Sequence, residues 1–271
     1  MQMDPSFALA LRAGDEAAVQ ATGLAAQDVE LLRAADPAGI SADPGGRRRT
    51  QVLGNATSEF RLSLGLLAGE ESARDVVSRF PASAEFHESV RRDRSLPLAF
   101  AAYARRRVES LPGVERLAAG AVLALETAMA RARRRSPATD PSELRADEVR
   151  LSPRASLLKL PAGTLALAAV LRDELDLETG AERPAPSTDE LESVLILSRR
   201  EGRRRSSQEL HVERLEPPSD RLLERARRPL GASDRSAFAR EVGASTQELE
   251  GFVDGLVADG VLLRGSARDP A

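Results

Sequence analysis

Cysteine is absent from this chain of 271 residues, and histidine occurs only as His87 and His211. Without cysteine the chain can form no disulfide bond, bind no metal through thiolates and supply no thiol nucleophile. A zinc or iron site needs several histidines, carboxylates or thiolates that converge. Because the two histidines lie far apart in the sequence, we expect no metal site and no cofactor in this chain.

Sequence motifs of the common catalytic classes are also missing. The chain has no G-x-S-x-G motif, no glycine-rich phosphate loop followed by Lys-Ser or Lys-Thr, and no dinucleotide-binding fingerprint. No spaced Asp and Glu signature stands out as a magnesium site. We therefore expect a protein that is not an enzyme and has no catalytic residues.

Long apolar runs and a positive net charge are lacking as well. No run approaches the roughly 20 apolar residues that a membrane-spanning helix needs. The first residues, MQMDPSFALALRAGDEA, lack the basic-then-apolar order of a signal peptide. The formal net charge of −3 gives no overall attraction to nucleic acid or to anionic membranes. These absences favour a cytoplasmic protein with neither a nucleic acid nor a membrane as its partner.

The chain's length suggests two domains. Residues 1–178 have mainly helical patterns, apart from 149–153 and 157–161, which look extended, and are predicted to form one helical domain. Residues 179–190 (TGAERPAPSTDE) are rich in helix breakers and lack periodicity, which predicts a linker. Residues 191–265 are predicted to form a second, smaller domain, and residues 266–271 a tail.

The helical domain contains clusters of arginine. In the predicted helix near 97–110, Arg105 and Arg106 lie on a face opposite the apolar one, and we predict them to dock a partner protein. A further predicted helix, 113–135, ends in several arginines, which capping electrostatics explain without a ligand.

The smaller domain is predicted to begin with two strands. Residues 194–197 (VLIL) are apolar on both alternating faces, which suits a strand covered on both sides. Leu210 and Val212 alternate with His211 and Glu213, which suits a half-exposed strand. The pair is predicted to form a β-hairpin.

Three helices and a short strand are predicted to follow the hairpin. The helices are expected at 219–228, 234–242 and 246–259, the last starting with a capping box of Ser245 and Glu248. This order is typical of a winged helix-turn-helix domain. The predicted fold class is mainly α: an N-terminal helical domain followed by a small α+β winged helix-turn-helix domain with a β-hairpin.

A helix-turn-helix domain commonly binds DNA through its second helix, which presents Arg or Lys to the phosphates. The corresponding segment here, 246–259, contains no Arg or Lys and has several carboxylates. The arginine runs at 47–49, 105–107, 133–135 and 203–205 leave a DNA-binding transcriptional regulator as an alternative. A purely structural interaction protein is a third possibility.

Peptide binding fits the pattern better. An edge strand leaves main-chain groups that an extended peptide can continue, with side-chain pockets between that strand and the last helix. We predict peptide contacts from the edge strand and from the last helix, although Phe252 and Leu256 could instead serve only the domain core. The predicted peptide-binding residues are Glu209, Leu210, Val212, Leu249, Phe252 and Leu256.

Four stretches together resemble a known family. They are residues 49–64 (RTQVLGNATSEFRLSL), 123–128 (LALETA), 149–161 and 194–199. The helical portion is similar to the partner proteins of multinuclear non-haem iron oxidases in the biosynthesis of modified ribosomal peptides. The C-terminal portion resembles the peptide-recognition element of those pathways, the winged helix also found in the pyrroloquinoline quinone chaperone.

The resemblance implies a non-catalytic adaptor in a hetero-oligomer. Its C-terminal domain would bind a ribosomally made precursor peptide, and its helical domain would dock the separate iron oxidase that modifies the peptide. The irons would belong to the oxidase.

Overall fold

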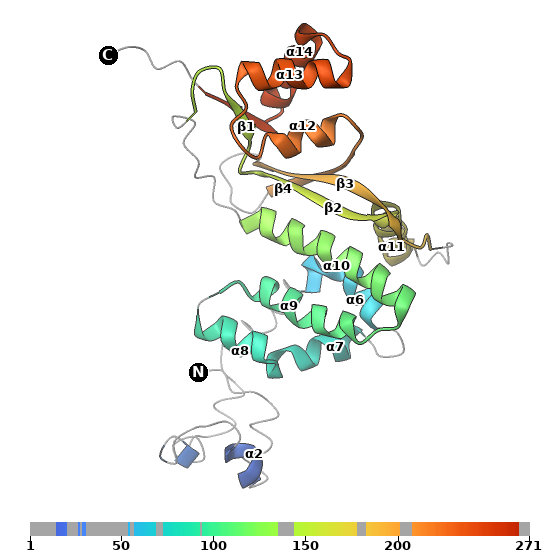
Figure 1. The fold of residues 1–271 in the computed structure, drawn as a ribbon. Coiled ribbons are helices and arrows are strands. Elements are labelled where there is room, and N and C mark those ends of the chain that lie inside the picture. Colours follow the sequence, from blue (N-terminus) through green and yellow to red (C-terminus); the bar gives the residue numbers. More distant parts are fainter. Residues whose placement is uncertain are drawn as a thin grey trace. The chain divides into compact units, whose positions relative to one another are not determined.

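The structure is a computed structural model, and it describes most of the chain from residue 57 onward together with short pieces before it (Figure 1). The predicted tail, 266–271, and residues 179–182 of the predicted linker lie outside the described residues. The described residues are 15–20, 27, 29–30, 54, 57–68, 73–92, 94–134, 144–177, 183–200 and 208–265.

Two compact units divide the chain between Leu123 and Ala124. The division falls inside helix α10 (Gly113–Arg134) and not in the predicted linker at 179–190. The expected helical domain of 1–178 therefore does not match the structure, in which residues 124–178 belong with the C-terminal segment. The physical reason lies in strand pairing, described below.

The first unit is helical in its described part. Ser83 caps the start of α8, where its side chain accepts a hydrogen bond from the Phe86 N–H at 3.2 Å, and Pro97 lies in the first turn of α9. Its elements are α2 (Glu16–Gln20), α6 (Arg61–Ala68), α7 (Ala73–Arg79), a 3₁₀ turn (Phe80–Ala82), α8 (Ala84–Arg91), α9 (Leu96–Glu109) and the first half of α10.

An aromatic cluster forms the core of this unit. Phe80 lies edge-on to Phe86 and to Phe100, with ring centroids 5.4 and 5.2 Å apart, and Phe60 lies 5.5 Å from Phe100. Tyr103 packs beside them and donates its hydroxyl to the Val76 carbonyl at 3.2 Å. Five of the chain's eight phenylalanine and tyrosine residues therefore lie in this one core.

The second unit contains all the strands of the described residues. An antiparallel three-stranded sheet has the order β2-β3-β4, and a separate pair joins β1 to β5. The strands are β1 (Val149–Leu151), β2 (Ala155–Ala162), β3 (Ser187–Arg200), β4 (Gln208–Leu215) and β5 (Leu262–Arg264). The helices that follow α10 are α11 (Thr164–Leu177), α12 (Ser219–Arg225), α13 (Ala232–Val242) and α14 (Thr246–Ala258).

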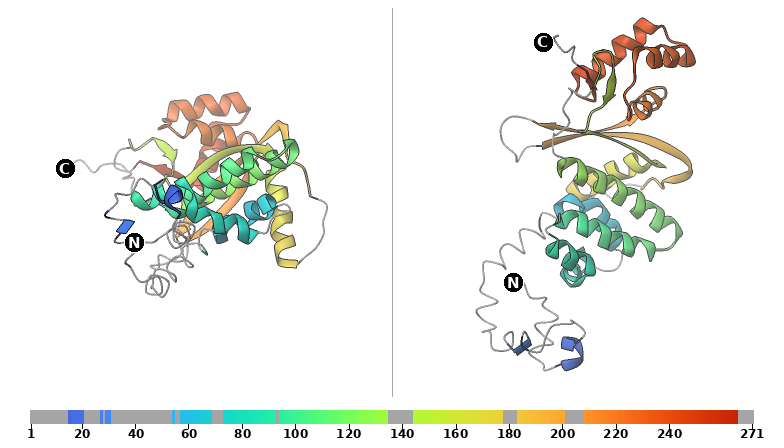
Figure 2. Two further views of the ribbon diagram at one scale, coloured as in Figure 1. Left: turned by 90° about the horizontal axis from the view of Figure 1, so that it is seen from below. Right: turned by 60° about the vertical axis from the view of Figure 1, so that its left-hand side comes forward.

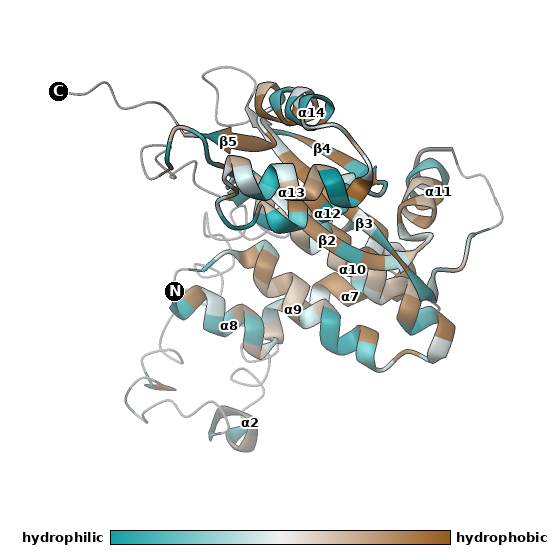
Figure 3. Cartoon of the chain, turned by 45° about the horizontal axis from the view of Figure 1, so that its top comes forward, coloured by the Kyte–Doolittle hydropathy of each residue, from teal (hydrophilic) through white to brown (hydrophobic). Residues whose placement is uncertain are grey.

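Strand β3 is covered on both faces, as its continuous apolar run predicted. Leu195 and Leu197 face the core formed with α12, α13 and α14, while Val194 and Ile196 are fully buried on the other face. Figure 2 shows α12 to α14 on one side of the sheet, with α11 and the second half of α10 on the other. In Figure 3 β3 is hydrophobic over its middle and hydrophilic towards its start.

The predicted β-hairpin is confirmed as β3 and β4, but β3 begins earlier than expected. It starts at Ser187, inside the predicted linker, and its first half pairs with β2. Leu157 lies opposite Leu195 in this pairing. Sequence periodicity identified 149–153 and 157–161 as extended but not their partners, so they were assigned to the wrong domain.

The pair β1–β5 ties the same early segment to the end of the unit. Val149 lies opposite Arg264, and it also exchanges backbone hydrogen bonds with Leu230, between α12 and α13, at 2.8 and 3.0 Å. Val149 is fully buried in the core of the unit. A unit that began at residue 191 would therefore lack part of its own core.

We expect a fragment of residues 124–265 to fold and one of residues 191–265 not to fold. The shorter fragment loses β1, β2 and α11, and with them the cover over Val194 and Ile196. These two side chains are fully buried in the structure, and exposing them to water would cost about 1.5–3 kcal/mol of folding free energy each. Circular dichroism melting of the two fragments tests this. A cooperative melt of 191–265 would contradict the structural boundary and support the linker predicted from sequence.

Candidate functional site

The candidate site is the outer edge of β4. The sheet ends at this strand, and on its outer side no strand from the described part of the chain pairs with it. Eight residue pairs connect its inner side to β3, from Ser193 opposite Leu215 to Arg200 opposite Gln208. Edge strands present unpaired N–H and C=O groups to which an extended chain can bind. The prediction that this strand lies at an edge is confirmed.

The other edge of the sheet, formed by β2, is protected. Lys159 is exposed on it, and Pro161 has no N–H with which to extend the ladder. Arg227 donates from its Nη2 to the Leu157 carbonyl at 3.2 Å, which occupies a main-chain acceptor on this edge. β4 contains no proline, so the two edges differ in their capacity to accept another strand.

Alternation in the antiparallel ladder shows which groups of β4 point outward. The Ser198 N–H donates to the Arg154 carbonyl on the β2 side, so even-numbered β3 residues bond toward β2 and odd-numbered ones toward β4. Ile196 lies opposite Val212 and therefore does not bond to it. Consequently the main-chain groups of Leu210, Val212 and Arg214 point to the open edge.

Side chains of β4 divide between two faces of the sheet. His211 and Glu213 lie opposite Leu197 and Leu195, on the face that carries α12 to α14, and the His211 Nε2 lies 3.1 Å from a Glu213 carboxylate oxygen. Glu209 shares that face by alternation. Leu210 and Val212 lie on the opposite face, where both are half-buried. The predicted pockets between this strand and the last helix therefore cannot include Leu210 and Val212, because α14 lies on the other face.

The three predicted contacts on α14 have different surroundings. Leu249 is buried in the core of the unit, and Leu256 is half-buried against the same core. Phe252 is 42% exposed, which is unusual for so large an apolar side chain. Packing in the core therefore accounts for Leu249, whereas the side chain of Phe252 is accessible to solvent.

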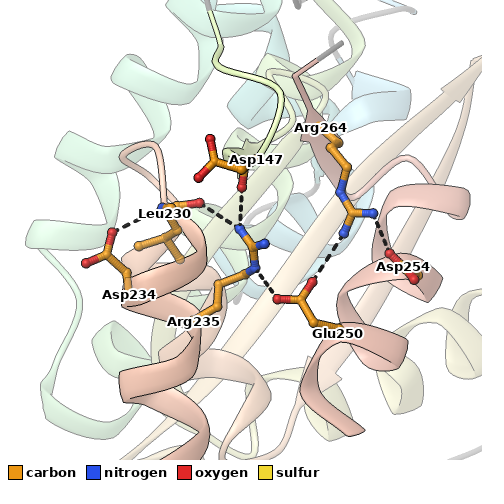
Figure 4. A network of polar contacts seen from close by, with 8 residues as sticks. Asp147, Leu230, Asp234, Arg235, Glu250, Asp254 and Arg264 are labelled. Atoms are coloured by element: carbon orange, nitrogen blue, oxygen red, sulfur yellow. Dashed lines mark hydrogen bonds and ion pairs between the residues drawn. The ribbon is translucent and has the colours of Figure 1, made fainter. Parts of the chain in front are cut away.

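Two arginines missed by the sequence analysis hold the carboxylates of α14 (Figure 4). The buried Arg235 on α13 donates to a Glu250 carboxylate oxygen at 2.7 Å and to the main-chain carbonyls of Asp147 and Leu230 at 2.7 and 3.0 Å. Arg264 on β5 pairs with Asp254 at 2.5 Å and lies 3.6 Å from Glu250. Nothing in the local sequence distinguishes these two from the chain's many other arginines.

Helix α14 begins with the capping box that the sequence predicted. The Ser245 hydroxyl accepts a hydrogen bond from the Glu248 N–H at 3.2 Å, and the Glu248 carboxylate accepts from the Ser245 N–H at 2.8 Å. The Ser245 hydroxyl also donates to this carboxylate at 2.7 Å, and the hydrogen bonds that the carboxylate accepts from the Ser245 N–H and hydroxyl lower the pKa of Glu248. Glu248, like Glu250 and Asp254, therefore has a role within the unit, and the acidity of α14 is partly structural.

The predicted partner-docking arginines lie on α9 in the first unit. Arg105 and Arg106 are both exposed. Arg106 forms an ion pair with Glu85 of α8. This pair joins two neighbouring helices, so Arg106 has a structural partner within its unit, and docking by either residue stays a prediction.

Comparisons with known proteins do not assign the chain to a family. No family model matches it, and no curated protein matches it significantly. Among the described residues, no group of three or more His, Asp or Glu side chains is arranged to hold a metal ion. None of the helices in the described ranges is long and apolar enough to cross a membrane.

Replacing Arg235 by leucine should destabilise the second unit by about 2–4 kcal/mol. The change leaves two main-chain carbonyls without their donor and removes the partner of a partly buried carboxylate. Arg240→Leu, an exposed position on the same helix, is the matched control and should change the free energy of unfolding by no more than about 0.5 kcal/mol. Urea denaturation measures both, and equal effects would contradict the role assigned to Arg235.

The capping box of α14 should make stability depend on pH. Because the pKa of Glu248 is lowered in the folded state, its contribution is present above the ordinary glutamate pKa and is lost as the pH falls through the folded value. Ser245→Ala should therefore lower the melting temperature at pH 7, and the difference from wild type should shrink as the pH falls below the ordinary glutamate value. A difference that stays constant over that range would show that the hydrogen bond from the Ser245 hydroxyl to the carboxylate contributes nothing.

Proposed function

We propose that this protein is a non-catalytic adaptor that binds a ribosomally made precursor peptide and presents it to a separate multinuclear non-haem iron oxidase. In this proposal the second unit is a peptide-recognition domain of the winged helix-turn-helix type. The peptide adds to the sheet along β4 as a further strand. The observation that carries the proposal is the contrast between the open β4 edge and the protected β2 edge.

The order of elements in the second unit supports this assignment. A three-stranded antiparallel sheet is followed by α12, α13 and α14, and α13 is joined to α14 by a turn in which Gly243 adopts a left-handed φ of 73°. A short turn containing glycine is typical of a helix-turn-helix. The pair β1–β5 would be the wing, with one of its strands supplied from before the sheet.

The expected strength of peptide binding suits a protein that must release what it holds. Each main-chain hydrogen bond to β4 contributes about 1 kcal/mol, and each buried aliphatic anchor adds roughly 1.5–3 kcal/mol. Association costs about 4–15 kcal/mol. With up to about six main-chain hydrogen bonds and two aliphatic anchors, the low end of that cost leaves about 5–8 kcal/mol, which corresponds to dissociation constants between about 1 and 200 μM.

The first unit is proposed to dock the oxidase. Its exposed arginines on α9, Arg105 and Arg106, are the proposed contacts. In the resulting hetero-oligomer the iron chemistry belongs to the partner enzyme. No structural observation favours the alternative of a transcriptional regulator, because α14 has no Arg or Lys and the cations beside it, Arg235 and Arg264, already pair with its carboxylates.

Val212→Pro tests the proposed binding mode. The change removes an outward N–H of β4 without removing a bond to β3, so peptide affinity should fall at least about fivefold, the value of one main-chain hydrogen bond of ~1 kcal/mol. Isothermal titration with a synthetic peptide that contains Val-Thr-Val between polar flanking residues measures this. Val212→Thr keeps the N–H and the branched side chain and should bind as wild type does.

Two results would contradict the proposal. One is unchanged peptide affinity in a Val212→Pro variant that melts at the wild-type temperature. The other is a mobility shift with duplex DNA that keeps a sequence preference at physiological salt, since a mere polyelectrolyte contact would be lost as salt rises.

A further inference from the structure

The two faces of β4 differ in chemistry. Glu209 and Glu213 are exposed carboxylates on the face of α12 to α14, with His211 between them. Leu210 and Val212 are half-buried aliphatic residues on the opposite face. An added strand places alternate side chains over alternate faces. Each face would therefore select its own kind of residue.

The carboxylate face makes the closer contacts with an added strand. Because the outward main-chain groups belong to Leu210, Val212 and Arg214, these residues would lie at the hydrogen-bonded positions of the new pair. Glu209, His211 and Glu213 would lie at the non-hydrogen-bonded positions, where the Cα atoms are about 4.5 Å apart and side chains lie closer together. Charge on this face therefore acts at the shortest cross-strand distance.

Glu213 is an acidic determinant with no cation directly opposite it. In the register of β3 and β4 its partner is the apolar Leu195. His211 lies 3.1 Å from Glu213 and is charged only when protonated. Arg214 lies on the other face and pairs with Glu216 at 3.2 Å.

We propose that the segment bound along β4 has the pattern basic, aliphatic, any residue, aliphatic, basic. This inference rests on the proposed function and specifies its ligand. The two basic residues lie opposite Glu209 and Glu213, and the two aliphatic residues lie opposite Leu210 and Val212. The bound strand is antiparallel to β4, because only antiparallel pairing creates the close non-hydrogen-bonded positions opposite Glu209 and Glu213.

The same charges disfavour a second copy of this chain as the occupant. Antiparallel pairing of two β4 strands about His211 would place Glu209 of each copy opposite Glu213 of the other. Like charges directly opposite each other destabilise a strand pair. A basic segment from another polypeptide avoids this repulsion.

Two labelled peptides test the pattern against the full-length protein. Both have flanking Gly-Ser residues; one contains Lys-Val-Thr-Val-Lys and the other Glu-Val-Thr-Val-Glu. Fluorescence anisotropy at low salt gives the dissociation constants. We expect the basic peptide to bind at least about threefold more tightly than the acidic one, because opposite-charge cross-strand pairs are favourable and like-charge pairs are not.

Glu213→Lys should reverse part of that preference. It should weaken the basic peptide and strengthen the acidic one, each by about threefold. Glu109→Lys is the matched control, because it makes the same change in net charge at an exposed position on α9 of the first unit and should leave the preference unchanged. Equal effects of the two variants would mean that only net charge matters and would overturn the pattern.

The remaining outcomes separate this inference from the proposed function. If both peptides bind equally well and Val212→Pro weakens both, the β4 edge binds peptides without the proposed charge selection, and only the inference fails. If neither peptide binds at about 1 mM, the β4 edge does not accept an added strand, and both proposals fail. Self-association that Val212→Pro abolishes would make the occupant a second copy and would also overturn the inference.

Discussion

Strand β3 is the element on which the second unit depends. It pairs with β2 on one side and β4 on the other, and its four consecutive residues Val194 to Leu197 are buried on both faces. Burying a strand on both faces requires cover from two directions. The helices α12 to α14 provide one layer, and α11 with the second half of α10 provides the other. The boundary of the folded unit is set by the need to cover both faces of β3, and not by the helix-breaking residues at 179–190.

Buried charged side chains also connect the elements of the second unit to one another. The buried Glu192 on β3 accepts a hydrogen bond from the Leu165 N–H at 2.8 Å, at the start of α11. Its negative charge also interacts favourably with the positive end of the α11 dipole. On the other side of the sheet, Arg235 links α13 to α14 and to the segment before β1. Each layer is therefore joined to a neighbouring element by a buried charged group that hydrogen-bonds inside the protein.

The sequence predicted local structure more successfully than pairing. The apolar run 194–197, the alternation at Leu210 and Val212, and the box of Ser245 and Glu248 are each set by residues close in the chain, and each is confirmed. Strands β1 and β2 were recognised as extended, but their partners lie far along the sequence, and hydrophobic periodicity carries no information about partners. The same limit explains the error at the site. The sequence placed Leu210 and Val212 on one face, but only the register of β3 shows that α14 covers the other.

The pairing of β1 with β5 has a consequence for how the chain is made. Val149 pairs with Arg264, which is synthesised 115 residues later. Contacts between segments so distant in sequence form late and slowly compared with local helices. Until β5 has emerged from the ribosome, Val149 lacks one of its two strand partners, and a nascent chain stalled before that point would display an incomplete apolar core to chaperones and proteases.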